Sequence, residues 1–229
     1  MAQNRLGRFG MLALVAIVTI LAVSGSAFVI AGANPIEAYQ AYFITPLTRE
    51  FTLLEVLNKA TPILFTGTAV AIAFRAGYWN IGVEGQLLMG AVAAAGIGQV
   101  VDGLSPIVVL PLMVGAGAIA GALWALVPAL LRVKMGIDEV VTTLLLNPVA
   151  LLVVQGLLHG PWKDPETGFP ESPRIATAAE FPQLSEFIPL IGRSRLHLGF
   201  VIAVVLIVIA WYVLSRTSTG LRVRAVGLS

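Results

Sequence analysis

The sequence predicts an all-α, polytopic transmembrane helical bundle of about six spans. Of its 229 residues, 58% are hydrophobic and only 11% are charged, and the mean hydropathy is +0.92. Soluble domains contain about 45–50% apolar and about 25% charged residues, so this chain could not cover a water-facing surface. Four of its uncharged runs reach the length of about 20 residues that a membrane-crossing helix needs. The runs fall at residues 9–36, 60–74, 85–101, 103–131, 140–162 and 196–215.

The first run, residues 9–36, follows Arg5 and Arg8. This arrangement is similar to a cleavable signal peptide, but the apolar core is longer than the ~7–15 residues of a signal sequence. We therefore expect a retained membrane anchor.

The second and third runs, residues 60–74 and 85–101, are short and flank a polar stretch. We expect both spans to be shortened by a helix broken around residues 75–86. The remaining three runs, in contrast, are long enough to cross a bilayer without interruption.

Lys and Arg residues favour a cytoplasmic N-terminus. On this orientation 8 of the 14 basic residues lie inside, all in short loops or the tail, whereas four of the six outside lie in one long loop. Basic residues in short loops determine orientation, so both termini are expected in the cytoplasm.

The long loop, residues 159–195, holds six of the 13 prolines and is expected to be a folded external cap. Proline prevents one continuous helix there, although residues 177–187 could form a short interfacial helix. No second soluble domain is visible, so residues 1–229 are expected to form one transmembrane domain that includes this external loop.

Composition excludes several classes of function. The chain has no Cys and only two His residues, which leaves no convincing metal set and no cofactor site. A net charge of +2 is too small for a nucleic-acid footprint. A glycine-rich phosphate loop is missing, as is any nucleophile with a base, so we expect neither a built-in ATPase nor an enzyme.

Small residues recur every four positions in two of the spans. They are Gly90, Ala94 and Gly98 in the third and Gly117 and Gly121 in the fourth. Helices in lipid approach closely at small residues, so these spacings predict tight helix packing.

The segment from Gly77 to Gln86 is the most informative polar stretch. It places Asn80, Glu84 and Gln86 between two apolar runs, with glycines that relax the backbone. Irregular backbone at membrane depth is tolerated where it is buried in protein or lines a watery cavity, which favours a broken helix beside a solute pathway. An ordinary cytoplasmic loop, with Glu84 stabilising a helix N-terminus, explains the pattern equally well.

A second polar stretch opens the fifth span. Glu139, Thr143 and Asn147 are four apart and share one helical face. That face could line a pathway or hydrogen-bond a neighbouring helix, and Asp138 is placed to cap the helix. The basic stretch after the last span is typical of a juxtamembrane end at anionic lipid.

Three stretches carry a resemblance to a known family. They are FRAGYWNIGVEGQLLMGA at 74–91, GIDEVVTTLLLN at 136–147 and TSTGLRVRAVG at 217–227. In sequence, order and spacing they resemble permease subunits of bacterial ATP-binding-cassette (ABC) importers of the ribose and branched-chain-amino-acid type. The similar branch contains the simple-sugar and nucleoside permeases that pair with basic-membrane-protein lipoproteins.

The resemblance implies a multi-pass protein of the bacterial inner membrane that imports nucleosides or simple sugars. Its implied partners are an ABC ATPase subunit, a second permease subunit, a substrate-binding lipoprotein and membrane lipid, but no nucleic acid. The implied pathway residues are Tyr78, Trp79, Asn80, Glu84, Gln86, Thr143 and Asn147. Those implied to couple to the ATPase are Thr219, Gly220, Arg222 and Arg224.

Family members continue past the position of Gly227 with several more spans. We therefore expect the chain to be the N-terminal part of a longer family domain, as a truncated, frameshifted or fragment product. Two alternatives stay open: a branched-chain amino-acid permease of the same type, and an inactive membrane scaffold.

Overall fold

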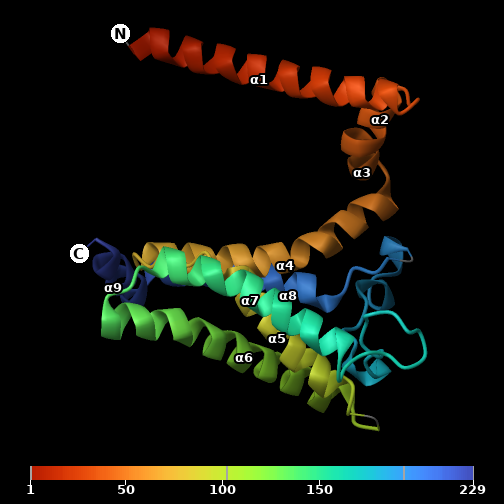
Figure 1. Cartoon of the computed structure of the whole chain (residues 1–229), viewed down its shortest axis with the longest axis vertical. Helices are drawn as coiled ribbons and strands as arrows, with labels where there is room; N and C mark the ends of the chain where they lie inside the picture. The colour runs from red at the N-terminus through yellow and green to blue at the C-terminus, as the bar shows by residue number, and fades with distance from the viewer. Residues whose placement is uncertain (1, 102, 193, 229) are drawn as a thin grey trace. The chain divides into compact units, whose positions relative to one another are not determined.

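The computed structural model describes residues 2–101, 103–192 and 194–228, and regular structure within them is almost entirely helical (Figure 1). Five of the described helices are long and apolar enough to cross a membrane. They are α1 (Ala2–Ile30), α4 (Glu50–Arg75), α6 (Pro106–Met135), α7 (Glu139–His159) and α8 (Leu198–Arg216). A shorter apolar helix, α5 (Val83–Gly98), corresponds to the third expected span. The predicted polytopic helical bundle is confirmed.

The chain divides into two compact units, residues 1–56 and 57–229. In the first, α1 is followed by α2 (Pro35–Tyr39), a π-helical turn (Gln40–Ile44) and α3 (Thr45–Thr48). The Tyr39 hydroxyl lies 2.5 Å from the Leu21 carbonyl oxygen, to which it donates, and 2.8 Å from the Ser24 hydroxyl. These contacts hold the start of the connection against the last turns of α1.

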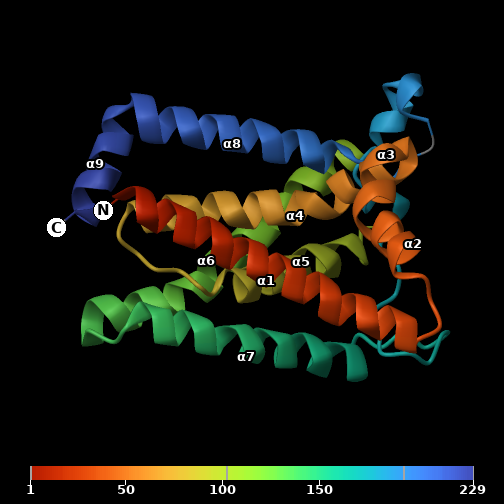
Figure 2. The same ribbon diagram turned by 90° about the horizontal axis from the view of Figure 1, so that it is seen from above.

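In the second unit, α5 packs against both α6 and α7 (Figures 1 and 2). A Cβ placed on Gly90 would lie 3.0 Å from the Gly117 carbonyl oxygen, and one on Gly117 would lie 3.2 Å from that of Gly90. Gly121 approaches the backbone of Gln86 in the same way. The small-residue spacings therefore do mark a tight helix interface, as predicted.

Two helix boundaries follow their local sequence closely. α6 ends at Met135, and its C-cap Gly136 has a φ of 68°, the left-handed conformation that glycine adopts most readily. Asp138 then caps α7, because its carboxylate accepts hydrogen bonds from the backbone N–H groups of Val140 (2.8 Å) and Val141 (3.1 Å). The capping role predicted for Asp138 is confirmed.

α4 begins earlier than its uncharged run, which starts at residue 60. Its first turns carry Glu50, Glu55 and Lys59. Charge limits where a helix can lie in lipid but does not prevent helix formation, so the helix is longer than the apolar run.

The short helix predicted at residues 177–187 is wrong. Two separate 3-10 turns, Thr177–Ala179 and Leu184–Glu186, lie there instead, and Pro182 between them has no backbone N–H to continue a helix. A third such turn spans Pro189–Ile191. The loop is nevertheless folded onto the membrane helices, since Ala179 packs with Val101 and Val109 and the Ala176 N–H donates to the Gly98 carbonyl oxygen at 2.8 Å.

The tight α5–α6 contact predicts different outcomes for two glycines on the same helix. Gly117→Leu should destabilise the protein by about 1–3 kcal/mol or more, because the side chain would enter the backbone of α5. Gly115→Leu should be nearly neutral or slightly stabilising, since nothing lies within 4 Å of a Cβ there and leucine favours a helix. Thermal unfolding of the detergent-solubilised variants measures both, and equal losses would contradict the packing described.

Candidate functional site

The predicted helix break lies between α4 and α5. α4 ends at Arg75, α5 begins at Val83, and Gly77 between them adopts a φ of 75°. A stretch of non-helical backbone therefore joins two apolar helices, and its N–H and C=O groups need partners from elsewhere in the protein.

The Gly77 and Tyr78 N–H groups donate to carbonyl oxygens of α4, whereas two side chains of α7 supply the partners of Ile81. The Thr143 hydroxyl accepts from the Ile81 N–H (3.2 Å) and donates to the Glu139 carbonyl oxygen (2.6 Å). The Asn147 side chain donates through Nδ2 to the Ile81 carbonyl oxygen (3.0 Å) and accepts through Oδ1 from the Gly85 N–H (2.9 Å). Among the described residues, the hydrogen bonds that join residues 80–86 to another helix all go to this pair.

The bond to Gly85 also caps α5. Gly82 stands at the N-cap position and has no side chain that could accept from the first turn of the helix. Asn147 takes this role from a neighbouring helix, 62 positions along the chain from Gly85. The start of α5 is thus fixed by tertiary contact with α7.

Within the segment, Asn80 and Gln86 form a reciprocal amide pair. Asn80 Nδ2 donates to Gln86 Oε1 at 3.1 Å, and Gln86 Nε2 donates to Asn80 Oδ1 at 3.0 Å. Asn80 Oδ1 also accepts from the Gly82 N–H at 3.0 Å. Asn80 is buried, so these bonds satisfy an amide that would otherwise be costly to remove from water.

Glycine is required where the segment meets α7. A Cβ on Gly82 would lie 2.9 Å from both the Cβ and the carbonyl oxygen of Thr143. One on Gly85 would lie 3.1 Å from Asn147 Oδ1 and 2.9 Å from Trp124 Nε1. The glycines in the motif therefore allow the close approach that the hydrogen bonds need.

The structure brings together Asn80, Gln86, Thr143 and Asn147 but not the other predicted pathway residues. Trp79 is 55% exposed and packs on Phe74, with ring centroids 4.8 Å apart. Glu84 is exposed, and among the described residues no hydrogen bond or ion pair reaches its carboxylate. The Tyr78 hydroxyl is buried and makes no hydrogen bond with a described residue.

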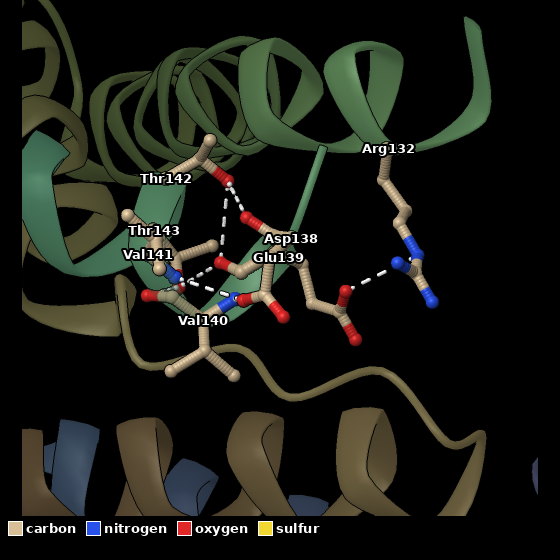
Figure 3. A network of polar contacts seen from close by, with 7 residues as sticks. All are labelled: Arg132, Asp138, Glu139, Val140, Val141, Thr142 and Thr143. Carbon is tan, nitrogen blue, oxygen red and sulfur yellow. Dashed lines mark hydrogen bonds and ion pairs between the residues drawn. The ribbon is translucent and has the colours of Figure 1, made fainter. Parts of the chain in front are cut away.

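Figure 3 shows an ion pair that sequence reasoning missed, at the start of α7. Arg132 Nε, in the last turn of α6, lies 3.2 Å from Glu139 Oε2, in the first turn of α7. The Glu139 side chain is only 8% exposed, whereas that of Arg132 is 50% exposed. This ion pair could have been predicted from the sequence. A cation at the C-terminal end of one helix and an anion at the N-terminal start of the next each stabilise the helix dipole, and a short turn brings the two ends together.

The residues predicted to couple to an ATPase lie on α9 (Ser218–Gly227), which follows α8 after a bend at Thr217. The Thr217 hydroxyl accepts from the Gly220 N–H at 3.3 Å, and Gly220 approaches the carbonyl oxygens of Val213 and Leu214 too closely for a Cβ. Thr219 and Arg222 are exposed, and Arg224 Nε donates to the Gly220 carbonyl oxygen at 3.3 Å.

The end of α9 meets the broken segment. A Cβ on Gly77 would lie 2.9 Å from the Gly227 Cα, and one on Gly227 would lie 2.5 Å from the Arg75 carbonyl oxygen. This contact is between two stretches of backbone, and glycine at both positions permits it.

The cluster offers amide and hydroxyl groups rather than catalytic chemistry. Among the described residues, no group of three or more His, Cys, Asp or Glu side chains could hold a metal ion. A cavity of about 400 Å³ adjoins Gln86 and is lined by Leu87, Gly90, Met113 and Gly117 as well. The arrangement can position backbone and form hydrogen bonds beside a mostly apolar cavity.

Residues 52–229 match the family described as the branched-chain amino acid transport system / permease component. The chain is 39% identical over 216 residues to the glucose ABC transporter permease protein TsgB13 of Haloferax volcanii, covering 92% of this chain and 56% of that protein. It is 32% identical to the guanosine ABC transporter permease protein NupP of Bacillus subtilis, covering 94% of this chain and 61% of that one. No solved structure shows a significant match.

A third relative, the nucleoside ABC transporter permease protein NupB of Lactococcus lactis, is 28% identical over 86% of this chain and 55% of its own length. The chain therefore spans between 55% and 61% of the length of these three relatives.

Adjacent threonines on α7 provide a matched test of the site. Thr143→Val should cost about 1–3 kcal/mol, because it leaves the Ile81 N–H, which is partly shielded from solvent, without an acceptor. Thr142→Val makes the same chemical change, but that hydroxyl bonds only carbonyl groups of its own helix end, so the cost should stay within about 0.5 kcal/mol. Chemical denaturation in detergent compares the two, and a larger loss for Thr142→Val would refute the docking role of Thr143.

Proposed function

The chain belongs to the family of branched-chain amino acid transport system permease components, and we propose that it forms part of the membrane pathway of an ATP-driven importer for nucleosides or simple sugars. It is a multi-pass membrane protein and a transport subunit rather than a catalyst. The observation that carries the proposal is the non-helical segment between α4 and α5, in which polar side chains of α7 bond both backbone groups of Ile81 and the nearby N–H of Gly85 at the start of α5. Such interrupted helices in transporters line solute pathways.

The proposed cargo follows from the relatives and from the chemistry of the segment. The three relatives are named for glucose, guanosine and nucleosides, which are uncharged or weakly charged molecules rich in hydroxyl groups. An amide side chain such as Gln86, which borders the cavity, suits hydroxyl-bearing solutes. A zwitterionic amino acid would in contrast need paired charges, because isolated charges are expensive away from water. An inactive scaffold needs no such polar segment.

The proposed partners are a separate ABC ATPase subunit, a second permease subunit and a substrate-binding lipoprotein. We place α9 at the cytoplasmic ATPase, because it carries exposed Thr219 and Arg222 and is held firmly to α8 through Gly220. On this orientation the N-terminus is cytoplasmic, the chain lies in the inner membrane, and the loop at residues 159–195 faces the external lipoprotein.

Uptake of labelled solutes tests the proposed cargo. Cells that express the chain with its cognate importer subunits should accumulate labelled uridine, adenosine or glucose, but not leucine. Gln86→Ala should lower uptake several-fold because it removes the amide pair with Asn80. The matched Gln155→Ala, on the exposed surface of α7, should leave uptake near the wild-type level. Accumulation of leucine alone would favour the amino-acid permease instead.

Co-purification tests the proposed coupling surface. Arg222→Glu should reduce recovery of the ATPase subunit with the permease several-fold, because it reverses an exposed charge on α9. Arg174→Glu makes the same change on an exposed residue of the 159–195 loop and should not affect recovery. If Arg174→Glu releases the ATPase and Arg222→Glu does not, the proposed orientation is reversed.

A further inference from the structure

The position of the segment at residues 80–86 depends on the position of the first turns of α7. Its hydrogen bonds to another described helix go to Thr143 and Asn147, which lie one and two turns into α7. Any rotation or tilt of the first turns of α7 would move both side chains together. An interaction that restrains the first turns of α7 therefore also positions the segment at residues 80–86.

In the connection between α6 and α7, the Gly136 and Ile137 N–H groups donate to the Arg132 and Leu131 carbonyl oxygens of α6, at 3.0 and 3.4 Å. Three residues, 136–138, separate the two helices, and Gly136 lies in the left-handed conformation. Asp138 caps α7 but bonds only to backbone groups of α7 itself. Among the described residues, the hydrogen bonds of this turn therefore go to α6 from Gly136 and Ile137 and to α7 from Asp138, and none of them joins α6 directly to α7.

The Arg132–Glu139 ion pair adds a direct side-chain link between the two helices. It joins the last turn of α6 to the first turn of α7 (Figure 3). The carboxylate is nearly buried, so its charge is poorly solvated and depends on Arg132 as its partner. The charges also match the dipoles of the two helix ends at which they sit.

Glu139 is linked to the segment through two consecutive hydrogen bonds. Its carbonyl oxygen accepts from the Thr143 hydroxyl at 2.6 Å, and that hydroxyl accepts from the Ile81 N–H at 3.2 Å. The donated proton leaves a lone pair of the Thr143 oxygen directed to Ile81. The residue that pairs with Arg132 therefore also sets the orientation of the hydroxyl that holds the segment.

We propose that Arg132 and Glu139 are positioning residues for the segment at 80–86, acting by locking the first turn of α7 against α6. In this proposal the pair acts through Thr143 and Asn147 rather than by binding cargo. This inference rests on the proposed function in one respect only, namely that the segment matters for uptake. The effect on segment position is a separate physical statement.

Hydrogen exchange tests the positioning directly in the full-length chain in detergent. Glu139→Gln should speed exchange of the Ile81 and Gly85 amides by about tenfold relative to the amides of α8. Asp138→Asn is the matched control: it neutralises the neighbouring carboxylate but keeps an oxygen that can cap, so exchange at 80–86 should not change. A uniform rise that includes α8 would mean general destabilisation and would overturn the proposal.

The pair must also behave as a unit. Arg132→Gln, a change at a half-exposed residue that the fold should tolerate, is expected to speed the same amides. The double variant should be no faster than Glu139→Gln alone, because either change already breaks the interaction. Lys134→Gln, two positions from Arg132 in the same last turn of α6, should have no effect. Additive effects of the two changes would overturn the proposal.

Uptake assays separate this inference from the proposed function. Where the wild-type chain with its partners takes up nucleoside or sugar, Glu139→Gln should lower the maximal rate several-fold and Asp138→Asn should not. Normal uptake by Glu139→Gln, together with faster exchange at 80–86, would overturn the role of the pair in transport. If the wild type takes up none of the solutes, the proposed function fails, while the exchange data still decide the positioning.

Discussion

The interaction on which the rest of this structure depends is the docking of a non-helical segment onto the polar face of α7. In an apolar environment each unpaired backbone group costs several kcal/mol, so a broken helix persists only where other groups replace the lost bonds. Thr143 and Asn147 do this for Ile81 and Gly85. Asn147 also substitutes for the N-cap that Gly82 cannot provide, so the end of the segment and the start of α5 are set by the same side chain.

This docking requires α5 to approach its neighbouring helices closely. Glycines at the N-cap of α5 and along the helix allow that approach. Gly82 and Gly85 admit α7, while Gly90 admits the backbone of α6 on the other side. α5 thereby contacts α6 through backbone at Gly90, and it contacts α7 through the side chains of Thr143 and Asn147 and the Thr143 carbonyl oxygen. The contact with α6 has little freedom to deform, because two glycines meet there and neither can yield by changing a rotamer. The polar segment is therefore presented on a rigid support.

The sequence was sufficient for features that depend on nearby residues. The helix break, the cap at Asp138 and the small-residue interface each follow from local chemistry, and the structure contains them. Features that depend on three-dimensional pairing were not accessible. The helical spacing of Thr143 and Asn147 placed them on one face, yet nothing local shows that this face meets Ile81, 62 positions from Thr143. The error at residues 177–187 is of another kind, because Pro182 is visible in the sequence and its lack of a backbone N–H was a local signal against one helix there.

The contact between Gly227 and Gly77 places a second element, α9, against the broken segment. α9 is fixed to α8 at its start through Gly220 and reaches the Arg75–Gly77 turn at its end, in both places by backbone contact. A displacement of α9 toward this turn cannot be absorbed by side-chain rearrangement, because neither glycine has a side chain to move. The turn itself must move, and the nearest part of the chain that can respond is the non-helical segment between Gly77 and α5. α7 resists that movement through Thr143 and Asn147. The segment therefore lies between α9, which is exposed at the surface, and α7, which the ion pair of Arg132 and Glu139 links to α6.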